Sequence, residues 1–319
     1  MKIPSLIVRI GQSIRGRYQA TPFQLMDWTI IIYLLLIGIL VIPFHQDVNN
    51  WGIYPPLHLL LAIGLMEFIR FSESRSSRIL KTIRLFYPIL LATLGWKELN
   101  NLITMIFPYW ANDLLIRTDL LLFGTHPTVW IERLFTPWLT ELMNFFYAVF
   151  WIYIPVIALT LYCKNREQDL FDFLFSVSLT YVVCFTLFLF FPGEGAWIIL
   201  KDLHQVDPEG GFFQSLNQAA QARGTIRGGA IPSSHVAVAF VVSLASIKYF
   251  KRLGTLLLIL SFGVAFATVY CRYHHAIDAI TGMLTGFCIF RISNRILLKW
   301  KAQRTFSVSE RLPDTRGPI

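Results

Sequence analysis

The chain alternates between long apolar runs and shorter polar connections that carry most of its charged residues. A helix needs about twenty mostly apolar residues to cross a bilayer, and somewhat fewer where its neighbours shelter its ends. Eight runs meet this requirement, although 85–96 and 235–247 are short. The pattern predicts an all-α membrane protein of about eight transmembrane helices, at residues 25–44, 55–71, 85–96, 142–162, 170–191, 235–247, 253–270 and 276–292.

Two connections are longer than a simple turn requires. Residues 97–141 contain Trp110, Trp130 and Trp138 and apolar pieces too short to span, which predicts interfacial helices anchored by aromatic side chains. Residues 193–230 are richer in Gly and in acidic residues. Long ordered loops of this kind are often functional lids or walls.

Composition agrees with the membrane assignment, because 55% of the 319 residues are hydrophobic and only 15% are charged. The distribution of basic residues predicts the orientation of the chain in the membrane, since short cytoplasmic loops accumulate Lys and Arg. Both termini are therefore expected in the cytoplasm, as an even number of spans requires. The expected outer side holds only a minority of the 28 basic residues, namely Lys97, Arg117, Arg133, Lys201, Arg223, Arg227 and Arg272.

The net charge of +9 is thus explained by topology and by attraction to anionic lipid headgroups. Nucleic-acid binding is disfavoured because the basic residues are dispersed among loops and no nucleic-acid-binding motif is present. The four cysteines have no C-x-x-C spacing, so neither a disulfide framework nor a zinc site is indicated.

Two polar motifs fall at the expected outer ends of apolar helices. Pro232-Ser233-Ser234-His235 opens the sixth run, and His274 to Asp278 occupies the turn between the seventh and eighth. The charge count did not use these residues, yet both motifs fall on the same side of the membrane. Ionisable groups are rarely kept near a membrane without a function. This agreement indicates a site.

The residue types suggest phosphoryl transfer through a histidine. His274 and Asp278 are four apart, so they share a helix face if the eighth helix begins at this turn. A carboxylate there can fix the imidazole tautomer and leave the other nitrogen free to attack. His235 is suited to protonating a leaving oxygen, and Ser233, Ser234 and the helix-start amides supply donors for a phosphate.

With these motifs the chain resembles the type 2 phosphatidic acid phosphatase superfamily of membrane lipid phosphatases and phosphotransferases. Its second motif, P-S-G-H, is similar to Pro232-Ser233-Ser234-His235, and the end of its third, H-x-x-x-D, is similar to His274 to Asp278. Likeness is best over 170–292 and weaker around Asp119 to Gly124. The resemblance implies His274 as nucleophile, Asp278 as its orienter and His235 as acid, without a metal.

The chain departs from the family where phosphate-binding cations are expected. The first motif, K-x6-R-P, is absent, and the Ser-Arg that begins the third falls on Ala267-Thr268. Arg227 and Arg272 are therefore candidates for a phosphate clamp or for headgroup contact. The same loss occurs in the branch resembling inositol phosphorylceramide and sphingomyelin synthases, which transfer a headgroup to an alcohol.

Further candidate residues and rival chemistries remain. Glu194 lies between two glycines that also suit a plain turn, and His275 cannot share the helix face of His274. Asp119 with Arg117 fits a structural pair better than a catalytic one. Two histidines and a carboxylate can form a metal triad, yet P-S-x-H at a helix start suits an oxyanion better. A lipid-binding or transport protein that keeps the fold without catalysis is the candidate from a different functional class.

The sequence therefore predicts N-terminal transmembrane helices at 1–96 and a phosphatase-like membrane domain at 97–295 that holds a six-helix catalytic bundle. Residues 296–319 are expected to form a basic cytoplasmic tail, mobile from about Ser307. The expected substrate is a membrane lipid phosphate or pyrophosphate, taken from the outer side, with hydrolysis favoured over transfer to a lipid alcohol. No cofactor is expected.

Overall fold

The computed structural model describes residues 22–309, with side chains described to Arg304, and this part of the chain is helical without strands. The basic residues before Pro22 and the predicted tail after Ser309 lie outside the described residues. Each of the eight predicted spans is a helix, so the fold class is confirmed. Their bounds are α2 Leu25–Leu40, α3 Tyr54–Ser74, α4 Arg78–Leu102, α7 Pro137–Cys163, α8 Glu167–Phe190, α11 Ser234–Tyr249, α12 Lys251–Tyr270 and α13 Ala276–Ser309.

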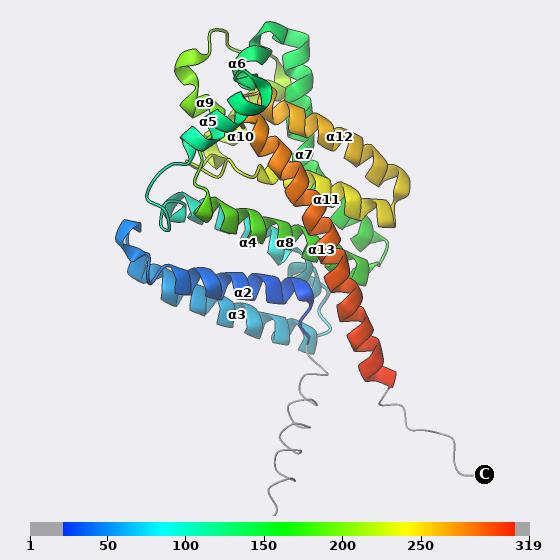
Figure 1. Ribbon diagram of the computed structural model, residues 1–319. Helices are drawn as coiled ribbons and strands as arrows, with labels where there is room; N and C mark the ends of the chain where they lie inside the picture. The colour runs from blue at the N-terminus through cyan, green and yellow to red at the C-terminus, as the bar shows by residue number, and fades with distance from the viewer. Residues whose placement is uncertain (1–21, 310–319) are drawn as a thin grey trace, which may run out of the picture.

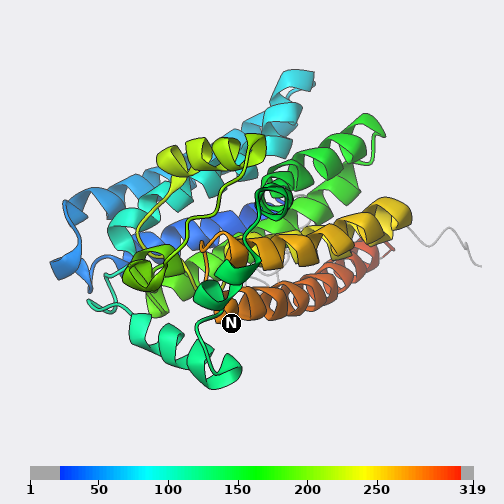
Figure 2. The same ribbon diagram turned by 90° about the horizontal axis from the view of Figure 1, so that it is seen from above.

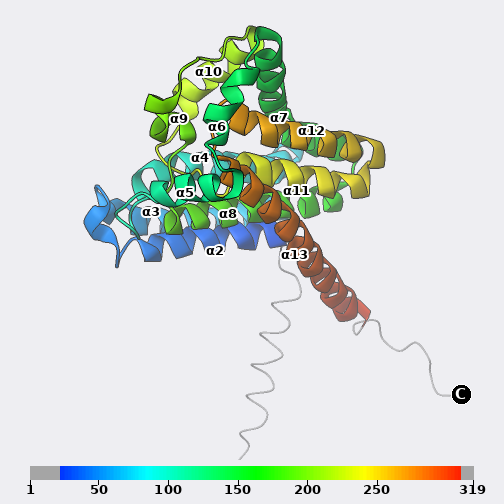
Figure 3. The same ribbon diagram turned by 45° about the horizontal axis from the view of Figure 1, so that its top comes forward.

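The axes of most of these long helices are roughly aligned, as the view from above shows (Figure 2). Six of them are long and apolar enough to cross a membrane, whereas α2 and α11 are shorter, with 16 residues each. The α2 and α3 helices lie along one flank of the bundle and α12 lies along the other (Figures 1 and 3).

Two helices extend furthest beyond their apolar runs. The α4 helix has 25 residues and continues past Lys97 and Glu98, and α13 has 34 residues and includes 296–309, the first part of the predicted tail. Lys, Glu and Arg are good helix formers, so a helix continues where its apolar run ends. Hydropathy locates the segment that suits hydrocarbon rather than the end of the helix.

The long connections contain short helices that gather at one end of the bundle (Figures 1 and 3). This finding confirms helices within 97–141. The elements are α5 Asn112–Phe123, α6 Pro127–Trp130 and α9 Ala196–Ile199, the longer α10 Phe212–Gly224, and the 3-10 turns Ile131–Leu134 and Lys201–Leu203. Two further 3-10 turns, His45–Asp47 and Trp51–Ile53, lie in the connection between α2 and α3.

Helix α10 is fastened to the start of α7 by side chains of α7. The Glu141 carboxylate accepts hydrogen bonds of 2.7 Å from the backbone N–H groups of Gly211 and Phe213, which caps the first turn of α10. One helical turn later, the buried Asn217 amide donates to the backbone oxygen and to Oδ1 of Asn144, both at 2.9 Å. The connection that precedes the P-S-S-H motif is therefore an ordered wall.

Helices α11 and α13 approach each other closely because α13 carries Gly282 and Gly286 on the facing side. A Cβ atom at Gly282 would lie 2.7 Å from the backbone oxygen of Ser233, and one at Gly286 would lie 2.6 Å from that of Ala237. Small residues four apart permit this kind of backbone approach in membrane helices. The start of α11 is thereby held beside the first turns of α13.

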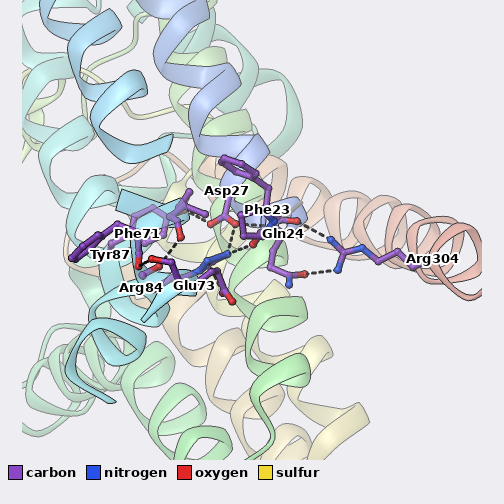
Figure 4. Close-up of polar contacts among 12 residues, drawn as sticks. Phe23, Gln24, Asp27, Phe71, Glu73, Arg84, Tyr87 and Arg304 are labelled. Atoms are coloured by element: carbon purple, nitrogen blue, oxygen red, sulfur yellow. Dashed lines mark hydrogen bonds and ion pairs between the residues drawn. The ribbon is translucent and has the colours of Figure 1, made fainter. Parts of the chain in front are cut away.

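The N-terminal helices join the bundle through a buried ionic cluster (Figure 4). The Arg84 side chain, 2% exposed, donates 2.9 Å to Oδ2 of Asp27 and 3.0 Å to Oε1 of Glu73, which connects α2, α3 and α4. Tyr87 donates 2.7 Å to the other oxygen of Asp27. On α13, Arg304 donates 2.8 Å to the backbone oxygen of Phe23. The cluster therefore ties both chain-terminal regions of the bundle together.

Candidate active site

The turn between α12 and α13 positions His274. The backbone of Arg272 adopts a left-handed conformation with φ of 63°, and His274 N–H donates 3.0 Å to the carbonyl of Thr268. A left-handed non-glycine residue is uncommon and is held in place by its surroundings. The turn therefore reverses the chain and aims the His274 side chain at the bundle.

Two carboxylates cap the first turn of α13. The Oδ2 atom of Asp278 accepts 2.8 Å from the backbone N–H of His275. From α5, Asp119 accepts 3.1 Å from the N–H of Ala276 and 2.9 Å from that of Ile277. Acidic groups at a helix N-terminus satisfy free amides and complement the helix dipole. The predicted pairing of Asp119 with Arg117 is wrong. The carboxylate of Asp119 binds the backbone amides at the start of α13, and Arg117 is exposed.

His274 and Asp278 face one another across the start of α13, which begins at Ala276, so His274 belongs to the preceding turn and Asp278 to the first turn of the helix. Their Nδ1 and Oδ2 atoms are 3.4 Å apart, and both side chains are buried. This separation is longer than an ordinary N–H···O hydrogen bond, and His274 Nδ1 has no other partner. Catalytic hydrogen bonds are frequently long before a ligand binds. The pair therefore has the geometry of an imidazole oriented by a carboxylate.

His235, the second residue of α11, lies across from this pair. Its ring centroid is 6.3 Å from that of His274. The link between the two helices is direct, since the N–H of Ser233 donates 2.9 Å to the backbone oxygen of Asp278. The structure therefore brings the two predicted histidines and the predicted carboxylate together.

A hydrogen-bonded chain leads from α10 to His235 and was not visible in the sequence. Gln221 donates 3.3 Å to the hydroxyl of Tyr147, which lies 3.2 Å from Nε2 of His235. The Tyr147 ring also stacks on the imidazole, with centroids 5.2 Å apart. A hydroxyl oxygen has two lone pairs and one hydrogen, so it can accept from Gln221 and also either accept from a protonated Nε2 of His235 or donate to an unprotonated one.

Both histidines line a cavity of about 360 Å³ whose walls are mostly apolar side chains from α4, α7, α8 and α10. Ser234 also lines this cavity. Lys97, near the end of α4, is the only Lys or Arg among the described residues that line it, and its ammonium donates to the backbone oxygen of Arg223. Sequence reasoning assigned Lys97 no role at the site, because it lies more than 170 residues from His274 in a run with no phosphate motif.

The other predicted phosphate-binding residues do not line the cavity. Arg272 is buried in ion pairs with Glu132, at 2.7 Å, and with Asp207, at 3.2 Å. Arg227 pairs with Glu194, whose second oxygen accepts 2.7 Å from Asn112. These contacts join the two long connections, 97–141 and 193–230, to each other and to the turn before α13.

Two further predicted residues are packed between helices. Ser233, also outside the cavity lining, is buried against Gly282, and its hydroxyl has no partner. His275 is fully buried, with Nδ1 3.7 Å from Oδ2 of Asp119. His274 and His275 both precede α13 and lie beside different carboxylates, Asp278 and Asp119 respectively.

Neighbouring titratable groups do not compete as nucleophiles. Burial raises the pKa of the Cys271 thiol, between α12 and α13, to about 12, so it stays protonated near neutral pH. Burial likewise raises the pKa of Tyr273, which lines the cavity. Within the described part of the chain, no group of three His, Cys, Asp or Glu side chains is placed to share one metal ion.

Comparison with known proteins covers the region just described. The family model of the PAP2 superfamily matches residues 115–292, more than half of the chain, from within α5 to within α13. A Dictyostelium discoideum protein named "PA-phosphatase related-family protein" is 31% identical over 131 residues, which is 39% of this chain and 23% of that protein. The chain thus spans less than a quarter of the length of this relative. No solved structure gives a significant match.

Proposed function

This chain belongs to the PAP2 superfamily, and from that premise we propose that it is a membrane lipid phosphatase that hydrolyses a lipid phosphate or pyrophosphate through a phosphohistidine at His274. One observation carries the proposal: His274 lies between Asp278, at 3.4 Å, and His235, at 6.3 Å between ring centroids, in the wall of a mostly apolar cavity. A cavity of this kind suits a lipid chain, and the polar groups suit its phosphate.

In the proposed first step, Asp278 accepts a hydrogen bond from the Nδ1–H of His274, which keeps the proton on that nitrogen and the lone pair on Nε2, and Nε2 attacks phosphorus. The P–N bond forms as the bond from phosphorus to the leaving oxygen breaks. His235 gives that oxygen a proton, so the lipid departs as a neutral alcohol, or as a phosphate from a pyrophosphate.

In the second step water attacks the phosphohistidine. His235, now deprotonated, accepts the proton of the water, the P–N bond breaks, and inorganic phosphate is released with His274 restored. Tyr147, held by Gln221, keeps the His235 imidazole in place through both steps.

Lys97 and the start of α11 are proposed to hold the phosphate. Lys97 supplies the positive charge of the cavity, and Ser234 and the first amides of α11 supply hydrogen-bond donors. Arg272 is not proposed for this role because Glu132 and Asp207 already pair with it.

Transfer to a lipid alcohol is the second candidate function, and the surroundings of His235 favour it. The rings of Phe150 and Trp151 lie 4.9 and 5.9 Å from its imidazole. An apolar environment at the proton-accepting group favours an alcohol acceptor over water. The phosphohistidine and the roles of His274 and Asp278 would be the same.

The test is an assay of purified full-length protein on a panel of lipid phosphates and pyrophosphates, with and without added lipid alcohols. Hydrolysis predicts release of inorganic phosphate without alcohol, and transfer predicts a phosphorylated alcohol. His274→Ala should abolish both, whereas His204→Gln, an outer-loop histidine that does not line the cavity, should keep them. Binding of the lipids without turnover would support a non-catalytic lipid-binding protein and contradict the proposal.

A further inference from the structure

The cavity that contains the two histidines continues away from them as a channel along the helices. Three helices each contribute one stripe of side chains to its walls: α4 from Pro88 to Lys97, α7 from Tyr147 to Pro155, and α8 from Leu174 to Phe185. Lining side chains recur every three or four residues on each helix, so each stripe is a single helix face. The stripe on α4 is about 14 Å long at a helical rise of about 1.5 Å per residue. The histidines therefore lie at one end of an elongated channel.

The far end of the channel, away from the histidines, is closed where α4 and α7 meet. The hydroxyls of Thr82 and Tyr162 are 2.7 Å apart in a hydrogen bond. The ring of Phe86 packs edge-on against that of Tyr162, with centroids 5.9 Å apart. These residues lie beyond the last lining residues of the two helices, Pro88 and Pro155. A ligand in the channel therefore cannot extend between α4 and α7 past this contact.

The histidine end of the channel lies under the last turn of α10. Nε1 of Trp96, on α4, donates 2.8 Å to the backbone oxygen of Gly224, and the ammonium of Lys97 donates to that of Arg223. From the same turn, Gln221 donates to Tyr147. Both ends of the channel are thus bounded by protein.

The long side of the channel between α4 and α7 is open. Thr93 on α4 and Trp151 and Pro155 on α7 line the channel and are also exposed. Both helices pack against α8, so the gap between them is the side opposite α8. Both are long and apolar enough to cross a membrane, and Leu90 and Ile152 beside the gap are exposed apolar side chains. The opening therefore faces the hydrocarbon of the bilayer.

Shape, polarity and position together identify the occupant. The groups proposed to bind and attack the phosphate, which include His274 and Lys97, are at one end of the channel. The far end is lined by Pro88, by Ile154, which is 8% exposed, and by Leu174, which is 1% exposed. A ligand that matches both ends has a phosphate at one end and a linear apolar chain at the other.

We propose that the channel selects the substrate by the length of its hydrocarbon chain. The chain enters sideways from the bilayer between α4 and α7 and lies along α8, with its end at Ile154 and Leu174. A chain longer than the channel has to turn back out through the opening. This inference rests on the proposed function, since the chain belongs to the lipid whose phosphate His274 attacks.

The test uses alkyl phosphonates, whose P–C bond is not hydrolysed, with a photoreactive diazirine either at the chain end or beside the phosphonate. Purified full-length protein in lipid nanodiscs is irradiated with each probe, and labelled peptides are identified by mass spectrometry. The terminal diazirine should label α7 and α8 around Ile154 and Leu174, and the other diazirine should label α11 around His235. As the chain is lengthened, labelling of the far end should rise and then fall.

Substitutions at the far end give a second comparison. Ile154→Phe fills this end and should lower its labelling by the terminal probe about tenfold, because overpacking costs free energy. Val156→Phe is the matched control, at an exposed position of α7 that does not line the channel, and should label like the unmodified protein. Leu174→Ala should move the chain length of maximal labelling upward. The comparison of the two probes needs no substitution and remains valid if Ile154→Phe does not fold.

Two results would overturn the proposal: a terminal diazirine that labels only the lipid-facing side chains of α4 and α7 at every chain length, or unchanged far-end labelling of folded Ile154→Phe. Because the phosphonate is not turned over, the labelling does not depend on catalysis. Far-end labelling without turnover of any lipid phosphate would contradict the proposed reaction and support the channel. Turnover without far-end labelling would contradict the channel alone.

Discussion

The carboxylate of Asp278 faces His274 and caps its own helix with the same oxygen. Oδ2 lies 3.4 Å from Nδ1 of His274 and accepts 2.8 Å from the backbone N–H of His275. Because the cap fixes the carboxylate, the imidazole meets an acceptor whose position is set by the start of α13. Rigid support of this kind is what a precise catalytic geometry requires.

The first prediction separates the two roles of this carboxylate. Asp278→Asn keeps an oxygen that can cap α13, but its amide can donate to His274 and favour the wrong tautomer. Lipid binding should remain nearly intact while kcat falls by several orders of magnitude. A wrongly set histidine tautomer lowers kcat about ten-thousand-fold in serine proteases. Phosphate release and lipid binding measure the two effects. Substantial activity in Asp278→Asn would contradict the role of orienter, and activity in His274→Ala would contradict the mechanism itself.

The second prediction concerns Tyr147 as a positioning residue. Tyr147→Phe keeps the ring that stacks on His235 but removes the hydroxyl 3.2 Å from Nε2. We expect kcat on a lipid phosphate to fall about tenfold with little change in KM, the effect of one lost hydrogen bond.

The leaving group provides the readout for this role. An aryl phosphate leaves without full protonation, so Tyr147→Phe should lose much less activity on it than on the lipid, as His235→Ala should. Equal losses on both substrates would indicate a structural effect instead.

The third prediction tests Lys97 as the cation of the cavity. Lys97→Met should raise KM for a lipid phosphate about tenfold, because a charge-assisted hydrogen bond is lost, and Lys97→Arg should recover part of it. Lys201→Met is the matched control, since Lys201 is an exposed lysine of the outer connection that does not line the cavity. An unchanged KM in Lys97→Met would contradict this role and would mean that the amides of α11, not Lys97, bind the phosphate.

The residues that were predictable are those whose partners are local. Hydropathy located every long helix, and the four-residue spacing placed His274 beside Asp278. The partners of Arg272 are not local, because Glu132 is 140 residues away, and an unpaired arginine near the site looked available for phosphate. Lys97 was missed for the converse reason, since only the packing of α4 against α10 brings it to the cavity.

The fourth prediction concerns the stability contributed by the buried cluster of Figure 4. Arg84→Met leaves the fully buried Asp27 without its cation, and breaking a buried pair typically costs about 3–5 kcal/mol. Thermal unfolding in detergent should therefore shift to clearly lower temperature. The exposed Arg75→Met should show little change. Adding Asp27→Asn to Arg84→Met should recover part of the loss, and further destabilisation instead would show that the ion pair is not the cause.

The last prediction tests the orientation, which the distribution of basic residues suggests. Glu209 and Asn165 are both exposed and lie at opposite ends of α7. Glu209 closely precedes Gly211, whose N–H donates to Glu141 near the start of α7, whereas Asn165 follows the end of α7 at Cys163. Cys163, Cys271 and Cys288 are first replaced by serine, because Cys163 and Cys288 are exposed and Cys271 is partly so, while the buried Cys184 is kept. In intact cells, Glu209→Cys should then react with an impermeant thiol reagent, and Asn165→Cys should react only after permeabilisation. That outcome would place the phosphate-binding cavity toward the outer leaflet, from which the substrate would enter. Labelling of Asn165→Cys from outside would invert the orientation, move the substrate to the inner leaflet, and show that the excess of Lys and Arg does not set the topology of this chain.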